Sequence, residues 1–240
     1  MKKGIVLERK KLEKTLNCLK KKKRILLVTT SSRWSGEKEL PKSSHLAKII
    51  KNTLGNRAKI IDASKLAIYP CEGNVSTSKG NRCGLKEALL NDKFKNPSGF
   101  HRCWASMNNA DDELWKISKA LFESDCIVFF GSVRWGQANS IYQKLIERLT
   151  WIENRHSTLG EEKIVKNIDA GIILVGQNWN GKNVVKTEKE VLKFFGFNVI
   201  SDLCWNWQYT KDYNDESEKS YKRGIKEFEK TFVKNLRGDK

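Results

Sequence analysis

The stretch Cys126-Ile-Val-Phe-Phe-Gly-Ser-Val-Arg-Trp-Gly136 decides the fold of this chain. Its first part, Cys126 to Phe130, is a short apolar run rich in β-branched and aromatic residues, which predicts a buried strand. We expect Gly131 to end the strand and Ser132 to Gly136 to form a polar turn. Apolar residues then recur at helical spacing from Gln137 to Asn154. In an open α/β sheet, ligands bind beyond the carboxyl ends of strands, where such turns gather.

The same alternation of strand and helix recurs along the chain. Besides the stretch above, the patterns predict strands at Arg24–Thr30, Ala58–Asp62, Ala170–Val175 and within Asn198–Trp207, and helices at Ile5–Lys23, Ser43–Leu54, Asp111–Phe122, Val184–Phe195 and Asp215–Leu236. Ser43 is the expected N-cap of its helix, and the acids Asp111 and Asp112 are expected to cap theirs. Five strands alternating with helices predict a doubly wound α/β fold: a five-stranded parallel sheet of order 2-1-3-4-5 with helices on both faces.

Length and composition predict one large domain with additions. The 240 residues are divided into a basic helical extension at 1–23 and a domain at 24–236, with a long irregular insertion at about 64–110. The insertion is long enough to suggest a lid, a metal site or an oligomer contact. No apolar run approaches the length of a membrane span, and six cysteines without dense spacing suggest reduced thiols. We therefore expect a cytoplasmic protein with no membrane partner.

The chain is strongly basic, with a formal net charge of +18. Lysine dominates, and the densest cluster lies in the first 24 residues. Such a surface could bind nucleic acid or an anionic cofactor. No nucleic-acid-binding motif accompanies the charge, so we interpret it as a solvated, lysine-rich surface.

A phosphate site is predicted where the first strand gives way to a helix. Hydroxyls at Ser31, Ser32, Ser43 and Ser44, with the cations Arg33 and Lys42, surround the start of that helix. Free backbone N–H groups and the helix dipole at such a position favour a phosphate. An ordinary capped helix below a polar loop would give the same pattern. The sequence lacks GxGxxG and GxxxxGK[ST], which disfavours a dinucleotide-type Rossmann site and a nucleoside triphosphatase.

Three turns, Ser31–Ser44, Gly131–Gly136 and Gly176–Gly181, together resemble the FMN site of the flavodoxin-like NAD(P)H-dependent FMN reductase family. The resemblance covers about Arg24 to Phe197 and is strongest from Asp111 to Arg148. It implies that FMN accepts hydride from NADPH or NADH and passes electrons to a small acceptor such as a quinone or a flavin. It also implies a homodimer, because the active site of this family is often completed at the subunit interface.

The resemblance places the cofactor on residues of these three turns. Ser31, Arg33, Ser43 and Ser44 would hold the phosphate, and the ring would meet mainly backbone of the other two turns. Trp135 and Trp179 are expected to flank the ring. No side chain is assigned as an acid or base. The implied ring contacts are Gly131, Ser132, Val133, Arg134, Trp135 and Gly136 in one turn, and Gly176, Gln177, Asn178, Trp179 and Gly181 in the other.

The chain departs from the family pattern at two positions. The turn after the third strand usually reads Ser/Thr-Pro-x-Tyr, whereas here it begins Gly131-Ser-Val-Arg134, and the usual lysine of the next helix is replaced by Gln143. Arg134 therefore puts a cation where the family has an aromatic ring. It could stabilise a negatively charged reduced flavin or meet a phosphate of the pyridine nucleotide.

Three cysteines of the insertion, Cys71, Cys83 and Cys103, lie near His101 in the sequence. Three thiols and an imidazole could ligate zinc or an iron–sulfur cluster. Their spacing lacks a Cys-x-x-Cys pair, so we predict reduced thiols and assign no metal.

Two other functions remain compatible with the sequence. One is a flavodoxin-type or iron–sulfur flavoprotein electron carrier, reduced by a protein partner instead of NAD(P)H. The other is a basic nucleic-acid-binding protein without flavin.

Overall fold

The computed structural model of the chain describes residues 2–33, 38–176, 179–208 and 217–233. Helices and strands follow one another in nearly the predicted order. Strands are β1 (Ile25–Thr29), β2 (Ala58–Asp62), β3 (Cys126–Arg134), β4 (Gln137–Ala138), β5 (Asp169–Gly176) and β6 (Asn198–Gln208); helices are α1 (Lys2–Leu19), α2 (Lys42–Leu54), α3 (Trp104–Asn108), α4 (Leu114–Phe122), α5 (Ser140–Ser157), α6 (Gly181–Phe194) and α7 (Glu218–Phe228). Short helical turns are η1 (Gly55–Arg57), η2 (Ala63–Lys65), η3 (Lys86–Ala88) and η4 (Glu229–Val233).

The sheet has the predicted strand order. Its path is β2-β1-β3-β5-β6, and every pair along this path is parallel. The short strand β4 pairs only with the end of β3, in an antiparallel hairpin. Leaving out this hairpin strand, the order is the 2-1-3-4-5 that the alternation of elements predicts, so the predicted fold class is confirmed.

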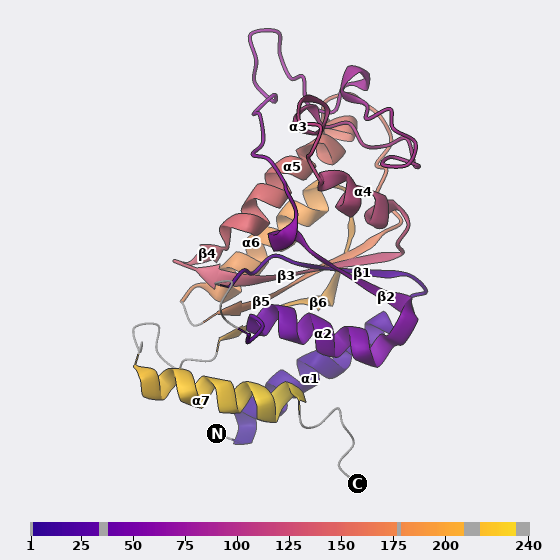
Figure 1. Ribbon diagram of the computed structural model, residues 1–240. Helices are drawn as coiled ribbons and strands as arrows, with labels where there is room; N and C mark the ends of the chain where they lie inside the picture. The colour runs from indigo at the N-terminus through magenta and orange to yellow at the C-terminus, as the bar shows by residue number, and fades with distance from the viewer. Residues whose placement is uncertain (1, 34–37, 177–178, 209–216, 234–240) are drawn as a thin grey trace.

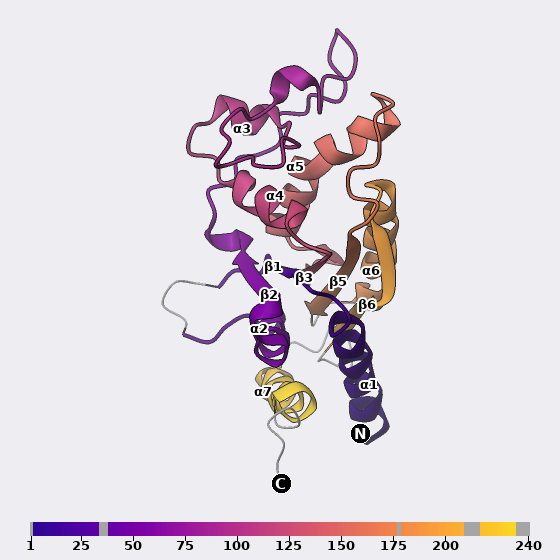
Figure 2. The same cartoon turned by 90° about the vertical axis from the view of Figure 1, so that its right-hand side faces the viewer.

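Helices cover both faces of the sheet (Figures 1 and 2). One core lies between the sheet and helices α4, α5 and α6, and includes Phe129, Tyr142 and Leu192. The other lies on the opposite face, under α1, α2 and the C-terminal helical segment, and includes Val128 and Phe228. Successive residues of β3 thus enter opposite cores, as the alternation of side chains along a strand requires.

Strand β3 is longer than its sequence predicts. Gly131 does not end it: the strand continues to Arg134, and the turn shrinks to Trp135 and Gly136. Gly131 is required by packing, because a Cβ there would lie 2.9 Å from Asn139 Oδ1 and 3.1 Å from Thr30 Oγ1. Pairing with β5 on one side and with β4 beyond it supplies the hydrogen bonds that carry the strand past the glycine.

Helix α2 also begins differently from the prediction. Pro41 occupies the N-cap position, and Ser43 lies inside the first turn of the helix instead of capping it. Its hydroxyl donates a hydrogen bond to Ser31 Oγ at 2.8 Å. The hydroxyl therefore connects the helix to the loop that follows β1.

A buried ion pair directly after the insertion holds the insertion against the domain. Arg148 Nη1 of α5 contacts Asp112 Oδ2 at 2.7 Å, and both side chains are fully buried. Of the two predicted capping acids, Asp112 accepts from the backbone N–H of Leu114, but the N-cap position of α4 is Glu113, and Asp111 accepts from the hydroxyl of Tyr69 instead. The main partner of Asp112 is the guanidinium. Arg148 donates further to the carbonyl of Tyr69 and to Ser106, both in the insertion.

Helix α1 packs along β6 and the C-terminal segment. Its residues Leu12, Leu16 and Leu19 are buried in the core of that face. Thr15 Oγ1 donates to the carbonyl of Asp202 and accepts from Trp205 Nε1. Among the residues that the structure describes, no helix combines the length and the apolar character needed to cross a membrane.

Candidate functional site

The loop after β1 and the start of α2 bring together a group of buried hydroxyls. Ser31, Ser43 and Ser44 are all buried, and Ser43 is hydrogen-bonded to Ser31. The Ser44 hydroxyl is buried and has no hydrogen-bond partner in the described structure. A buried hydroxyl without a partner costs free energy, so this group has an unused capacity for a hydrogen bond. It lies in the first turn of a 13-residue helix, where the dipole favours an anion.

Charged side chains lie beside these hydroxyls. Arg33 Nη2 is 3.8 Å from Glu39 Oε2, and Lys42 also pairs with Glu39. Partial burial lowers the pKa of Lys42, and the positive charge of Arg33 lowers it further. Glu229 lies close enough to oppose this lowering, so two cations and two carboxylates meet at this corner.

Asn139 joins the end of β1 to the end of β3. Its Nδ2 donates to the carbonyl of Thr30 at 2.8 Å. Its Oδ1 accepts from the backbone N–H of Ser132 at 3.0 Å and from the hydroxyl of Thr30 at 3.1 Å. One buried amide therefore sets the distance between the first and second predicted turns.

The tip of the β3–β4 hairpin is strained and exposed. Trp135 has φ 48°, a left-handed conformation that is unusual for a bulky residue, and its side chain is 87% exposed. Gly136 follows with φ 71°, where glycine is favoured. The carbonyl of Gly136 accepts from Asn180 Nδ2 at 2.9 Å, which ties the tip to the start of α6.

The third predicted turn meets the hairpin. A Cβ on Gly136 would lie 3.4 Å from the Trp179 ring, and one on Gly176 would lie 2.8 Å from Val133 Cβ. Gly176 belongs to β5 and Gly181 to α6, so the turn between them is shorter than predicted. Gln177 and Asn178 lie outside the described residues.

The structure thus brings the three predicted turns to one edge of the sheet. Exposure separates their residues into two groups. Gly131, Val133, Gly136, Gly176 and Gly181 are buried and support the turns, whereas Arg134, Trp135 and Trp179 have exposed side chains. A ligand above this edge would meet the two tryptophans and the arginine.

The sequence reasoning missed three residues that assemble the site: Thr30, Asn139 and Asn180. None belongs to a recognisable motif. Their positions in the sequence could have indicated them. Thr30 ends an apolar run, and the two asparagines directly precede helices, where their side chains can form hydrogen bonds to nearby backbone groups.

The cysteines of the insertion take part in structural contacts. Cys103 Sγ accepts from Arg148 Nε at 3.4 Å, and His101 Nε2 is bonded to Ser106 Oγ at 3.0 Å. Burial, with the charge of Arg148, lowers the pKa of His101 to about 3, and burial raises the pKa of Cys83 to about 11. Within the described ranges, no three histidine, cysteine, aspartate or glutamate side chains are grouped to hold a metal ion.

Comparison with known proteins finds likeness in structure and none in sequence. No family model and no curated protein sequence matches the chain. The crystal structure of RosB with a bound intermediate, 8-demethyl-8-formylriboflavin-5'-phosphate, aligns with a TM-score of 0.54 at 13% identity, over 89% of this chain and 77% of RosB. The azoreductase AzrA aligns with a TM-score of 0.50 at 12% identity, over 86% of this chain and 96% of that enzyme. Smu.1420 from Streptococcus mutans UA159 aligns with a TM-score of 0.50 at 12% identity, over 86% of this chain and 98% of that protein.

The chain has the flavodoxin-like fold. At these identities the likeness concerns the fold, and it agrees with the observed strand order. In a flavodoxin-like sheet of this order, the direction of winding reverses between β1 and β3, which is where ligands bind. Thr30, Ser132 and Asn139 lie at this switch point.

Proposed function

We propose that the chain is an FMN-dependent NAD(P)H oxidoreductase that passes electrons to a small acceptor such as a quinone or a flavin. The observation that carries the proposal is the convergence of three turns at the β1/β3 switch point, beside a buried hydroxyl that lacks a partner. In the flavodoxin-like sheet this position suits FMN. The proteins of similar fold named above include one with a bound riboflavin phosphate derivative and an azoreductase.

The residues present fit the phosphate of FMN. The unpartnered Ser44 hydroxyl lies at the start of α2, next to the bonded pair Ser31 and Ser43. Hydroxyls and helix N–H groups together form an anion-binding donor set. Arg33 and Lys42 add charge, although both also interact with Glu39.

The exposed aromatic residues fit the isoalloxazine ring. Trp135 and Trp179 offer flat apolar surfaces, and the Trp135–Gly136 turn presents backbone groups. When bound, FMN supplies the hydride and electron-transfer chemistry. The chain's own contribution is to hold the ring at the sheet edge and to leave it open to two substrates in turn.

Arg134 is proposed to act electrostatically. Its exposed side chain comes from the hairpin that carries Trp135. A cation there would favour a negatively charged reduced flavin or a phosphate of the nucleotide. The variant Arg134→Tyr tests this: we expect weaker FMN affinity or slower NAD(P)H turnover, and unchanged values for both would contradict the proposed role.

The decisive experiment is the visible spectrum of the purified protein, reconstituted with FMN and then treated with NADPH or NADH without oxygen. A flavin spectrum that bleaches with either nucleotide supports the oxidoreductase. A bound flavin that both nucleotides leave oxidised indicates an electron carrier. A protein that binds no FMN would overturn the proposal.

A further inference from the structure

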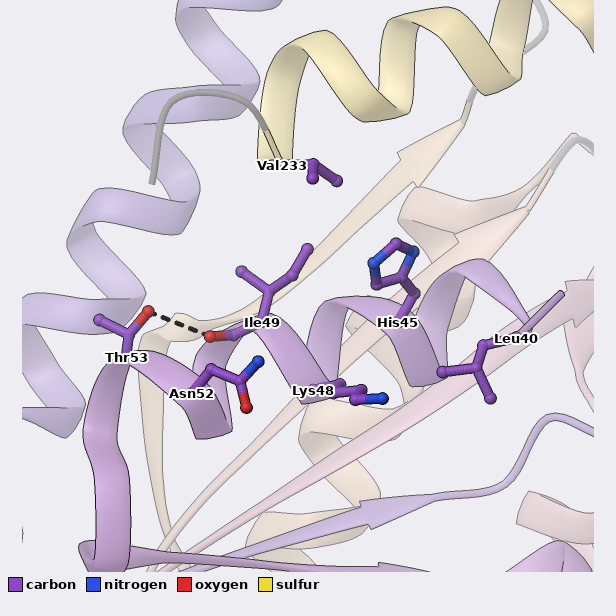
Figure 3. A pocket seen from close by; sticks show the side chains of 7 residues that line it. All are labelled: Leu40, His45, Lys48, Ile49, Asn52, Thr53 and Val233. Carbon is purple, nitrogen blue, oxygen red and sulfur yellow. Dashed lines mark hydrogen bonds between the residues drawn. The ribbon is translucent and has the colours of Figure 1, made fainter. Parts of the chain in front are cut away.

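A cavity outside the candidate flavin site lies between α2 and the C-terminal segment η4 (Figure 3). Its volume is about 460 Å³, within the range of small-molecule pockets. Side chains of α2 form its floor, Leu40 closes one end, and Val233 lies opposite His45 and Ile49. None of its lining residues is assigned to FMN.

The lining divides into an apolar part and a polar part. Leu40, Ile49 and Val233 are apolar, while His45, Lys48, Asn52 and Thr53 carry polar groups. His45, Lys48 and Asn52 lie about one turn apart along one face of α2, and Thr53 follows Asn52 directly, which brings their side chains to one wall. Small-molecule pockets typically combine apolar surface with a few such polar groups.

Lys48 and Asn52 have free hydrogen-bonding capacity. Within the part of the chain that the structure describes, the Lys48 ammonium forms no ion pair, and neither side chain makes a hydrogen bond. By contrast, Lys42 pairs with Glu39, and the hydroxyl of Thr53 donates to the carbonyl of Ile49 at 3.0 Å. The available donors at the cavity wall therefore include one unpaired positive charge.

His45 connects this wall to the aromatic core. Its ring centroid is 5.4 Å from that of Phe228. Partial burial lowers the pKa of His45, the charges of Lys42 and Lys48 lower it further, and Glu229 partly offsets them. The imidazole is therefore neutral near pH 7 and can donate or accept a hydrogen bond.

We propose that this cavity binds a small organic carboxylate with an apolar chain or ring. Lys48 is its counter-ion, Asn52 donates to the carboxylate, and the apolar body lies against Ile49 and Val233. The charge and the apolar wall together select this class: a neutral apolar molecule leaves the ammonium unused, and a small hydrophilic anion leaves the apolar wall unused. The inference does not rest on the proposed oxidoreductase function.

Octanoate is a suitable probe, titrated into the full chain at low ionic strength by calorimetry. We expect saturable binding at one site, with octan-1-ol and acetate each at least about tenfold weaker, because each lacks one of the two features. Equal binding of octan-1-ol would overturn the proposal, as would an absence of saturable octanoate binding.

Variants locate the site. Lys48→Gln removes the proposed counter-ion from an exposed position and should weaken octanoate binding about three- to tenfold. Lys93→Gln, an exposed lysine of the insertion, changes net charge equally and should leave binding unchanged. Equal effects of the two substitutions would show that only net charge matters and would contradict the proposal.

Two further readouts separate this cavity from the flavin site. Bound octanoate should raise the pKa of His45 in an NMR titration, because a nearby carboxylate favours the charged imidazole. Saturating FMN should leave the octanoate affinity unchanged. Competition between FMN and octanoate would place the carboxylate in the flavin site and overturn the assignment.

Discussion

Arg148 and Asp112 form an ion pair whose side chains are both excluded from water. Removing one partner of such a pair leaves an uncompensated buried charge, which is far more costly than the loss of an exposed pair. We expect Arg148→Met to lower the free energy of unfolding by about 3–5 kcal/mol. Urea denaturation followed by tryptophan fluorescence measures this loss.

Two controls distinguish burial of charge from general damage. Lys193→Gln breaks the exposed pair with Glu190 and should cost less than about 1 kcal/mol. The double variant Arg148→Met/Asp112→Leu removes both charges and should recover part of the stability. If the double variant loses more unfolding free energy than the two single variants lose together, this account is contradicted.

The same pair makes stability depend on pH. Burial alone would raise the pKa of Asp112, but hydrogen bonds and the charge of Arg148, with donors from Tyr69 and Ser106, outweigh burial and lower it. A carboxyl with a lowered folded pKa contributes stability above its unfolded pKa of about 4 and loses it as pH falls further. We expect Asp112→Asn to flatten the dependence of the unfolding free energy on pH below about pH 4. If the unfolding free energy of the variant and of the original chain changes equally with pH, Asp112 does not cause this pH dependence.

Ser44 provides a separate test of the phosphate site. Because its buried hydroxyl has no partner in the described structure, Ser44→Ala should leave the stability of the FMN-free protein unchanged or slightly higher. The same change should weaken FMN binding about three- to tenfold. Ser118→Ala removes another unpartnered buried hydroxyl, on α4, and should leave FMN affinity unchanged. Fluorescence titration of FMN measures both, and equal affinities for the two variants would refute the assigned role.

At the scale of the element, the sequence predicted the strands of the parallel sheet and the helices that flank it, but it missed β4 and α3 and the ends of several elements. The five apolar runs were sufficient for the strands of the parallel sheet, and β2 has the predicted bounds. The end of β3 was missed because Gly131 is a strand residue only when β4 and β5 pair beside it. Such pairing is a tertiary property that local composition does not encode.

The hairpin turn stores strain at a position proposed to be functional. Trp135 adopts φ 48°, which costs an L-residue about 1–2 kcal/mol, whereas asparagine tolerates this region. Because the indole is exposed, Trp135→Asn should keep the free energy of unfolding equal or raise it by up to about 1 kcal/mol. NAD(P)H turnover with FMN should fall, since the proposed ring contact is lost.

Phe194→Asn is the matched change for this hairpin prediction. It also removes an exposed aromatic side chain, but from helix α6, where asparagine relieves no strain. It should not raise stability. A clear loss of stability in Trp135→Asn would show that the indole is a packing residue and would contradict the strain argument.

At the scale of the whole molecule, the alternation of strands and helices was sufficient to predict the sheet order. Contacts between residues far apart in the sequence could not be predicted. The candidate site was half predictable: Ser31 and Ser43 follow from hydroxyls around a helix start, but the role of Asn139 requires knowing that β1 and β3 are neighbours. The packing of the two ends of the chain against each other also depends on contacts between residues far apart in the sequence. Trp205, on the last strand, donates to Thr15 of the first helix, and no local pattern indicates this pair.

The packing of α1 makes the first helix part of the domain's stability. Leu19 is fully buried against the sheet, whereas Leu7 of the same helix is 58% exposed. We expect Leu19→Ala to lower the free energy of unfolding by about 2–5 kcal/mol and Leu7→Ala by less than about 0.5 kcal/mol, measured by urea denaturation. Because Trp205 and Trp207 lie in the same core, the loss should appear in one cooperative transition of tryptophan fluorescence. Similar small effects of both substitutions would instead mean that residues 1–23 are an extension on which the sheet does not depend.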